Sequence, residues 1–195
     1  DLDLQYSLTD KAGNSSGYNN SGYKIGVDTI PPDIFVTPED RELGKTEVTA
    51  SVSVSDTGSG VKESKFTITS TSKPSSSDEW LTVSADNFNV DVTGTGTWYL
   101  HIKSYDNVGN SRDVSVGPFN VDIDKPIINA DPKKREWDNK DVNILLTVTE
   151  IGSELKEVRY SITNNTDRVY GGWQEINSNS INNITIIENG TWYLH

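Results

Sequence analysis

The chain has 195 residues, of which 33% are hydrophobic and 24% charged, and its formal net charge is −12 at pH 7. The negative charge argues against nucleic acid as a partner, because its phosphates would repel the chain, and no segment approaches the about 20 consecutive apolar residues that insert into a bilayer. The chain contains no Cys, which excludes disulfides, thiolate zinc sites and cysteine nucleophiles.

Alternating apolar and polar residues predict a series of β-strands. Residues 47–56 are the clearest example, because Val48, Ala50, Val52 and Val54 share one face while Thr and Ser residues occupy the other. In chain order, we predict strands at residues 47–56, 65–69, 87–92, 98–103 and 119–121. Turn sequences separate these strands at residues 56–60, 73–75, 94–96 and 107–110. No segment has a convincing helical periodicity.

About seven short strands in about 94 residues, with regular turns between them, indicate an antiparallel β-sandwich. The predicted strands are apolar on one face, so a second sheet has to cover that face. The predicted fold class is therefore all-β.

The sequence also repeats itself with a period of 94 residues. Gly96–His101 recurs residue for residue as Gly190–His195, and the alternating strand at residues 47–56 has a counterpart at the same offset. Part of a third copy precedes them, since residues 10–15 resemble residues 106–111. A period of about 94 is longer than the about 20–50 residues of solenoid repeats, so we expect each copy to be a domain with its own core.

The copies predict three domain segments. Residues 1–27 match the last two strands of a preceding repeat, residues 28–123 form a complete repeat, and residues 124–195 form a repeat that stops before its last strand. Because the first residue is not Met and the first and last copies of the repeat are incomplete, we expect the chain to be a piece of a longer protein. A repeat without its last strand exposes an open edge and core. We expect residues 1–27 to fill that gap by strand exchange between copies, or within one chain after a sharp fold-back.

Four segments carry a resemblance to a known family. They are the Pro-containing joint at residues 27–32, the Ser-Asp-x-Gly-Ser-Gly-Val-Lys turn at residues 55–62, the run at residues 98–110 that begins Trp-Tyr-Leu-His, and the segment 137–142. In these segments the chain resembles the bacterial Ig-like repeats of large cell-surface or secreted proteins. The resemblance implies tandem immunoglobulin-like antiparallel β-sandwiches with about seven strands per repeat, in which Leu100 occupies the strand position of an antibody Cys.

Acidic and amide side chains gather in the turns and joints, where oxygen ligands suit Ca²⁺, which takes six to eight of them. The candidate calcium ligands are Asp56, Asp106, Asn110, Asp122 and Asp124. The alternative interpretation is structural, because Asp and Asn also cap turns by hydrogen bonding to their own backbone. Glu150 replaces Asp56 in the other copy, and the tight spacing of an EF-hand is absent. We therefore expect no required cofactor, with Ca²⁺ as the candidate ion.

Catalytic constellations are not recognisable in the sequence. His101 and His195 are copies of one position, which the alternation places on the solvent side of a strand. No Ser-His-Asp triad can be assembled from the sequence, and no GxGxxG, P-loop or HExxH motif is present. We expect the chain not to be an enzyme.

The tryptophans allow two interpretations. Trp98 and Trp192 are in phase with the apolar face of a strand, which predicts that they are core residues. Trp80, Trp137 and Trp173 are expected to pack at sandwich edges or joints, and the alternative is a platform on which sugar rings stack. Exposed rings gathered in one place would favour a binding module, and buried rings would favour a structural protein.

The first functional interpretation is a structural one. The chain is expected to be a set of spacer or stalk repeats of a bacterial cell-surface or secreted protein, located outside the cell, which presents other domains and contributes to adhesion. Its partners are then the neighbouring repeats of the same chain. Proline in the joints limits bending, and an acidic surface rich in Ser and Thr keeps the protein soluble. The alternatives are a glycan- or protein-binding module and an accessory domain of an extracellular hydrolase.

Overall fold

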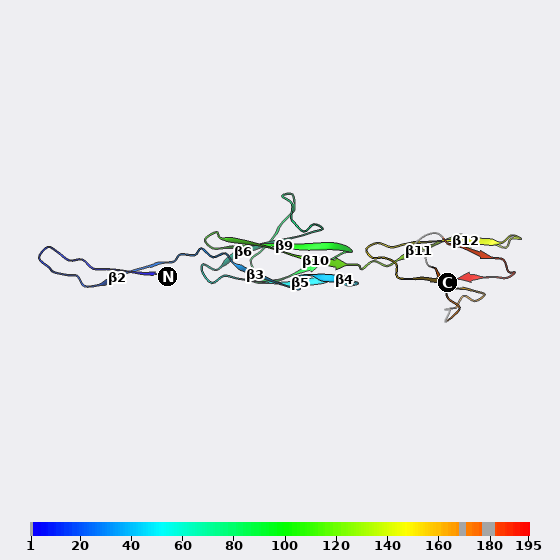
Figure 1. Ribbon diagram of the computed structural model, residues 1–195, viewed down its shortest axis with the longest axis horizontal. Helices are drawn as coiled ribbons and strands as arrows, with labels where there is room; N and C mark the ends of the chain where they lie inside the picture. The colour runs from blue at the N-terminus through cyan, green and yellow to red at the C-terminus, as the bar shows by residue number, and fades with distance from the viewer. Residues whose placement is uncertain (1, 168–170, 177–181) are drawn as a thin grey trace. The chain divides into compact units, whose positions relative to one another are not determined.

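The computed structural model describes residues 2–167, 171–176 and 182–195, and these residues form strands, turns and loops without a helix (Figure 1). The all-β prediction is therefore confirmed. Since the described residues include no helix, none of them belongs to a helix long and apolar enough to cross a membrane.

The strands of the N-terminal part are β1 (Leu2–Tyr6) and β2 (Asn19–Ile25). The middle part contains β3 (Asp33–Thr37), β4 (Arg41–Gly44), β5 (Val48–Ser55), β6 (Val61–Thr69), β7 (Leu81–Val83), β8 (Asn87–Val92), β9 (Gly96–Asp106) and β10 (Ser111–Val121). The C-terminal part contains β11 (Ile127–Asp131), β12 (Val142–Thr149), β13 (Val158–Tyr160), β14 (Ile162–Thr163), β15 (Gln174–Ile176), β16 (Asn182–Ile186) and β17 (Tyr193–Leu194).

The chain divides into two compact units. Unit 1 comprises Asp1–Arg41, Val48–Val92 and Trp98–Phe119, and unit 2 comprises Glu42–Glu47, Thr93–Thr97 and Asn120–His195. Most strands of the middle sandwich belong to unit 1, and strands β11 to β17 belong to unit 2.

A three-stranded antiparallel sheet in the order β3-β5-β8 forms one layer of the middle sandwich. Its central strand β5 alternates between buried and exposed residues along its whole length. Val48, Ala50, Val52 and Val54 are the buried members. This pattern confirms the strand predicted at residues 47–56, because a period of two places alternate side chains on opposite faces.

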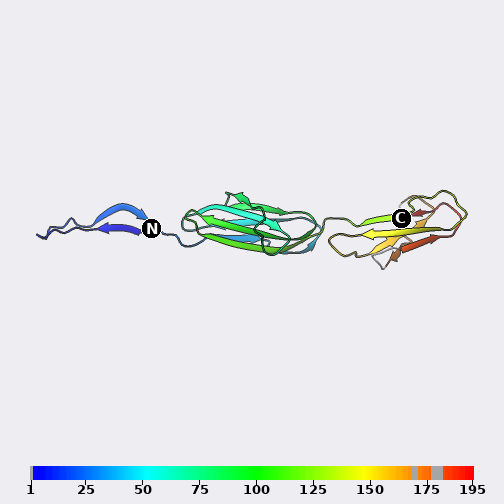
Figure 2. The ribbon, with the colours of Figure 1, turned by 90° about the horizontal axis from the view of Figure 1, so that it is seen from above.

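The other layer is a five-stranded sheet in the order β4-β10-β9-β6-β7. Its central strands contribute Leu100 on β9 and Phe119 and Val121 on β10 to the core, where all three are buried. Phe66 on β6 stacks on Phe88 of β8, with ring centroids 5.9 Å apart. Since β6 and β8 belong to different sheets, this pair shows that the two layers face each other over a common core, and Figure 2 shows their strands from above.

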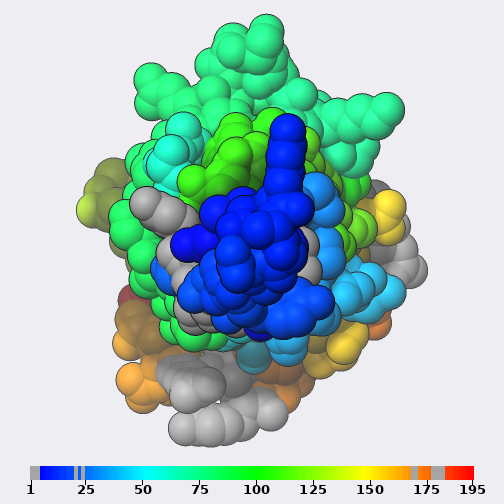
Figure 3. Space-filling view, turned by 90° about the vertical axis from the view of Figure 1, so that its left-hand side faces the viewer, coloured from blue at the N-terminus to red at the C-terminus, as the bar shows by residue number. Residues whose placement is uncertain are grey.

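The connection between β6 and β7 is the most prominent loop of the middle sandwich. It runs over residues 70–80 and projects away from the sheets in Figure 1, and its blue-green atoms stand out at the top of Figure 3. The start of this loop lies over β9, as described below for His101.

Unit 2 contains a three-stranded antiparallel sheet in the order β11-β12-β16 and two strand pairs, β13-β15 and β14-β17. Its core consists of Ile144, Leu146 and Ile184. The partly buried hydrophobic residues packed against this core are Ala130, Val142, Tyr160, Ile162, Ile176, Ile186 and Leu194. The pairing of β14 with β17 places Ile162 opposite Leu194.

Candidate functional site

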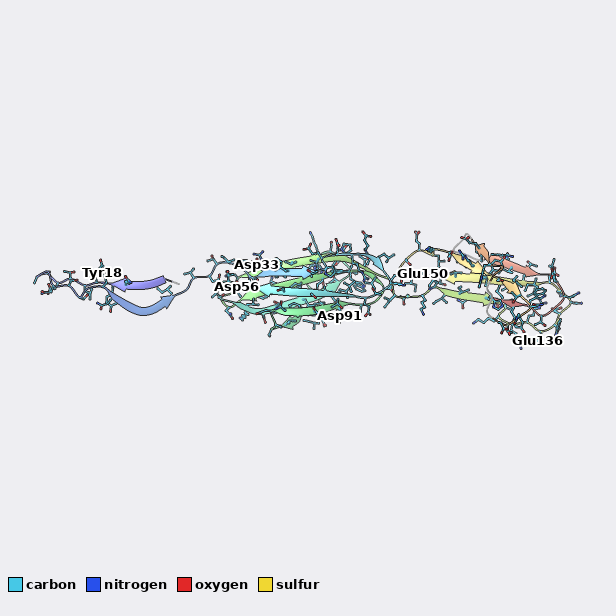
Figure 4. The ribbon with its side chains drawn as sticks, turned by 90° about the horizontal axis from the view of Figure 1, so that it is seen from below. Tyr18, Asp33, Asp56, Asp91, Glu136 and Glu150 are labelled. Atoms are coloured by element: carbon cyan, nitrogen blue, oxygen red, sulfur yellow. The ribbon has the colours of Figure 1, made fainter. Side chains whose placement is uncertain are left out.

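Three carboxylates converge at one end of the middle sandwich. Asp28 precedes β3, Asp56 follows β5 and Asp106 ends β9, and one oxygen of each lies within 4.8 Å of the others. Asp106 is fully buried, and the other two are half-buried. Figure 4 labels Asp56 at this end, near Asp33 at the start of β3. None of the ion pairs formed by the described residues involves any of the three carboxylates.

Glycines in the turn after β5 bring Asp56 and Asp28 together. Asp56 Oδ1 accepts hydrogen bonds from the N–H groups of Gly58 (3.0 Å) and Gly60 (2.7 Å). Gly60 has φ of +85°, in the left-handed region that glycine adopts readily. A Cβ atom on Gly58 would lie 2.4 Å from Cγ of Asp28. A larger residue at position 58 would therefore displace the Asp28 carboxylate.

The turn between β9 and β10 is organised around the buried Asp106 carboxylate. Its Oδ1 atom accepts three backbone N–H groups, from Val108 (3.0 Å), Gly109 (2.6 Å) and Asn110 (2.8 Å). The Asn110 side chain donates to Oδ2 at 2.6 Å. These bonds explain how a carboxylate without a cationic partner is accommodated in the interior, because each one compensates for lost hydration.

Asp28 connects the incoming chain to both of these turns. Its Oδ2 atom accepts the N–H of Ser59 at 2.6 Å, and its Oδ1 atom accepts the N–H of Ile30 at 3.1 Å. Hydrogen bonds from Ser59, and then from Ile30, lower the pKa of the Asp28 carboxyl. The Asn110 side chain donates to the Asp28 carbonyl oxygen at 3.2 Å. The three acidic residues therefore act as turn caps that tie two loops to the start of the sandwich.

The structure brings together only some of the predicted calcium ligands. Asp56 and Asp106 share the cluster, and Asn110 touches it through its amide nitrogen. Asp122 and Asp124 are not part of the cluster. They follow β10, whereas Asn110 precedes it. The 11 residues of β10 separate the two ends by about 36 Å at the usual rise per residue of a strand. Asp28 was missing from the predicted ligand set, although Asp122, its counterpart at an offset of 94, belonged to it.

Unit 2 repeats part of this arrangement. A Cβ atom on Gly152 would lie 2.9 Å from Oδ1 of Asp122. In the same way, a Cβ atom on Gly58 would lie too close to the carboxylate of Asp28. Glu150 stands in the loop after β12, where Asp56 stands after β5 (Figure 4). Among the described residues, Oδ1 of Asp122 and Oε2 of Glu150 are buried atoms without a hydrogen-bond partner. These two oxygen atoms could therefore serve as cation ligands without first losing a hydrogen bond.

His101 is buried, and the prediction that it lies on the solvent side of its strand is wrong. Its side chain is 1% exposed. Nδ1 lies 2.7 Å from the Ser115 hydroxyl on β10, and Nε2 lies 2.8 Å from the Thr69 hydroxyl and 3.2 Å from the Thr71 carbonyl oxygen. The alternation of apolar and polar residues predicted an exposed His101, because that reasoning assumes that only one face of β9 is covered. The start of the β6–β7 loop lies against His101 on the other face.

We expect the stability of the middle sandwich to fall as the pH decreases from about 7 to about 5. Burial lowers the pKa of His101 below its ordinary value of 6.5, against smaller raising effects of the Thr71 carbonyl and the Asp78 charge. The unfolded chain then binds a proton before the folded chain does, so this stability is present above pH 6.5 and is lost below it. Thermal unfolding followed by circular dichroism measures the effect.

The matched control for this titration is His101→Gln, which keeps a polar side chain and removes the titrating group. This variant should have a flatter dependence of the melting temperature on pH than the wild type in the same range. A wild-type melting temperature that stays constant down to about pH 5 would contradict the expected role of the buried imidazole.

The tryptophans do not form the predicted core. Trp98 and Trp192 are half-buried, and Trp192 Nε1 donates to the Glu188 carbonyl oxygen at 3.1 Å. Trp80 is half-buried, whereas Trp137 is 81% exposed and Trp173 is also exposed. Among the described residues, Phe66 and Phe88 form the only stacked aromatic pair. Rings that alternate with apolar residues along a strand are therefore not necessarily inside, because positions near a strand end remain open to solvent.

Comparisons with known proteins place few limits on function. No family model matches the chain, and no curated protein matches it. Among solved structures, the chain is similar to fibronectin(III)-like modules of CbhA from Clostridium thermocellum, at 15% sequence identity and a TM-score of 0.35. The similarity covers 82% of this chain and 95% of that one. The strand orders of the middle sandwich define the class of the chain, an all-β protein with antiparallel sheets packed face to face.

Proposed function

We propose that the chain is an array of tandem Ig-like sandwich repeats that acts as a structural spacer of a bacterial cell-surface or secreted protein, without enzyme activity. In this proposal, residues 28–123 are one complete repeat, residues 1–27 belong to the preceding repeat and residues 124–195 to the following one. The repeats present other domains and contribute to adhesion. The proposal places the chain outside the cell.

The observation that carries the proposal is the recurrence of side-chain contacts at an offset of 94 residues. The His101 Nε2 atom lies 2.8 Å from the Thr69 hydroxyl, and the His195 Nε2 atom lies 2.9 Å from the Thr163 hydroxyl. Each of these threonine hydroxyls donates to a carbonyl oxygen two residues later at 2.8 Å. Two segments of one chain that make the same local contacts at one fixed offset support a repeated domain.

Strand pairing gives the proposal further support. In the middle sandwich Ile68 pairs with Leu100, and in unit 2 Ile162 pairs with Leu194. A one-residue slip in either pair would turn the apolar side chains to the wrong face. The same register at the same offset therefore favours two copies of one fold over an accidental similarity of sequence.

We further propose that the cluster of Asp28, Asp56 and Asp106 binds a divalent cation, with Ca²⁺ as the candidate. All its side-chain donors are carboxylate oxygens, which suits this ion, and the described residues provide no ion pair to the cluster. The unpartnered buried oxygens of Asp122 and Glu150 support a corresponding site in unit 2. A cation at Asp28 would fasten the incoming chain to the loops after β5 and β9.

Single-molecule stretching of the full chain tests both parts of this proposal. A spacer is expected to resist force until the middle sandwich opens in one step and releases about 300 Å of hidden length, at about 3.4 Å per residue. The force of this step should be higher in Ca²⁺ than in EDTA. A gradual extension without a step would overturn the spacer. A step whose force is the same in both buffers would overturn only the cation site.

The binding-module alternative rests on Trp137, since this ring is 81% exposed. Trp137 lines a groove in unit 2 together with Trp192. A glycan platform normally needs rings that lie open and in line, whereas Trp192 is half-buried and donates a hydrogen bond to the backbone. The spacer therefore remains the better-supported function.

A further inference from the structure

The outer face of the sheet β3-β5-β8 carries an exposed aromatic ring. Phe35 lies in the middle of β3, and its side chain is 65% exposed. The next residue, Val36, is buried in the core, so the alternation of the strand turns the ring of Phe35 to solvent. The register pairs Phe35 with Ser53 on β5, and Ser53 with Asn87 on β8. These three side chains therefore form a row on one face, which extends over about 10 Å at the usual distance between strands.

An open groove lies beside this ring. Its volume is about 430 Å³, within the range of about 300–1,000 Å³ that is usual for small-molecule sites. No charged residue is among the eight that line it. Six of these eight belong to the outer face by their register, in two neighbouring rows: Phe35, Ser53 and Asn87, and Thr37, Ser51 and Asn89.

The polar side chains in these rows retain free hydrogen-bonding groups. The Ser51 hydroxyl donates to Asn89 Oδ1 at 2.9 Å, which leaves the amide nitrogen of Asn89 and its two N–H groups available. Within the described part of the chain, no hydrogen bond engages the side chain of Ser53 or of Asn87. An amide and a hydroxyl each contain a donor and an acceptor. The groove therefore combines an open ring with uncharged groups that can both donate and accept.

The ring is particular to the middle sandwich. At the offset of 94 residues, the pair Phe35–Ser53 corresponds to the pair Asn129–Thr147 between β11 and β12. Both pairs have the same register in a three-stranded antiparallel sheet, so the fold does not require phenylalanine at this position. An exposed ring leaves apolar surface in water, which the polar side chain of Asn129 avoids. A role in binding accounts for the ring of Phe35, whereas a role in folding does not.

The chemistry of the groove fits an uncharged sugar. The face of a phenylalanine ring carries partial negative charge, which attracts the C–H groups that cover one face of a sugar ring. Sugar hydroxyls both donate and accept hydrogen bonds, as the amides and hydroxyls beside the ring do. Of the two carboxylates at the ends of this face, Asp33 pairs with Arg112, and Asp91 has no cationic partner among the described residues (Figure 4). Asp91 and the net charge of −12 therefore disfavour an acidic ligand.

We infer that the groove beside Phe35 binds a short neutral oligosaccharide, with one sugar ring stacked on Phe35 and the next one hydrogen-bonded to the amides of Asn87 and Asn89. Eight residues line the groove, whereas a stable protein interface needs about 20–30 residues per side, so its size favours a sugar over a folded partner. A single open ring suits a short oligosaccharide or the end of a chain, since a long polysaccharide requires several rings in line. The site adds a glycan-binding function to a spacer repeat.

Binding of the full chain to immobilised oligosaccharides tests the inference. The neutral probes are oligomers of glucose, xylose, mannose, galactose and N-acetylglucosamine, and the acidic probe is an oligomer of galacturonic acid. We expect the wild type to bind a neutral oligomer and not the acidic one. Phe35→Ala should weaken this binding by about tenfold or more, because it removes the stacked ring, and Phe35→Tyr should bind like the wild type. Binding to no neutral oligomer, or to the acidic one alone, would overturn the inference.

Two further variants separate the ring from the fold. Phe35→Asn copies Asn129 of the other repeat and should lose binding with an unchanged melting temperature, because the ring is exposed. Leu81→Ala is the matched control, since Leu81 is 62% exposed on β7 of the other sheet, and it should bind like the wild type. Equal binding by Phe35→Asn and the wild type would contradict a site at this ring. Self-association in sedimentation that Phe35→Asn abolishes would assign the face to a second copy instead.

This test is independent of the proposed spacer. The stretching step of the middle sandwich depends on its core, and Phe35 lies outside that core. A chain that binds no sugar but still opens in one step would overturn only the glycan site. A chain that binds a neutral oligomer through Phe35 but extends without a step would overturn only the spacer.

Discussion

Replacing Phe119 with alanine is expected to lower the free energy of unfolding of the middle sandwich by about 3–5 kcal/mol. Phe119 is fully buried on β10, which pairs with β9, the strand that carries the fully buried Leu100 and Ile102. Truncation removes the transfer free energy of the ring and leaves a cavity, and a densely packed interior does not relax enough to fill it. Urea unfolding followed by circular dichroism measures the change.

Val108→Ala is the control for this loss. Val108 is apolar but exposed in the turn between β9 and β10, so its truncation should change stability by no more than about 0.5 kcal/mol. If Phe119→Ala cost no more than this control, the two sheets would not share the core described here.

Replacing Asp106 with alanine is expected to lower the free energy of unfolding by about 2–3 kcal/mol, measured in EDTA so that no cation contributes. The substitution removes the acceptor of three backbone N–H groups and of the Asn110 side chain. These donors lie in a partly buried turn, so water replaces the carboxylate only incompletely. Urea unfolding of the full chain measures the loss.

Two further variants define the origin of this loss. Asp106→Asn keeps the acceptor oxygen and should lose about half as much, because a neutral acceptor forms weaker hydrogen bonds than a charged one. Asp10→Ala removes a similar cap, which accepts the N–H groups of Ala12 and Asn14, from the exposed N-terminal hairpin of β1 and β2 and should leave the transition of the middle sandwich unchanged. Equal losses from Asp106→Ala and Asp10→Ala would show that burial of the cap has no energetic consequence.

Strands with strong alternation could be predicted from the sequence, whereas short strands could not. The prediction for residues 47–56 agrees with β5 because four apolar side chains repeat with a period of two. Strands β4 and β7 contain no buried residue. Their positions depend on pairing with β10 and with β6, and not on a pattern within the strands themselves. Phe119 and Val121 indicated only the end of β10, which begins at Ser111.

The candidate site could also be predicted only where a local sequence pattern marks its residues. Asp56 and Asp106 were recognised because each begins a glycine-containing turn. Their approach to Asp28 depends on the missing side chain of Gly58, which is a property of three-dimensional packing. The burial of His101 depends on the loop after β6, whose Thr71 carbonyl oxygen contacts the imidazole, and no periodicity within β9 contains that information.

The hydrogen bonds around Asp28 also affect where a protease first cleaves the chain. Connections between domains are normally cut first, because an exposed and flexible backbone can enter a protease active site. Here the Asp28 carboxylate accepts the N–H groups of Ile30 and Ser59, and the Asp28 carbonyl oxygen accepts a hydrogen bond from the Asn110 side chain. This connection cannot adopt the extended form that cleavage requires without breaking those bonds. Cleavage should then begin in the projecting loop between β6 and β7, and it would nick a sandwich without separating it from the hairpin.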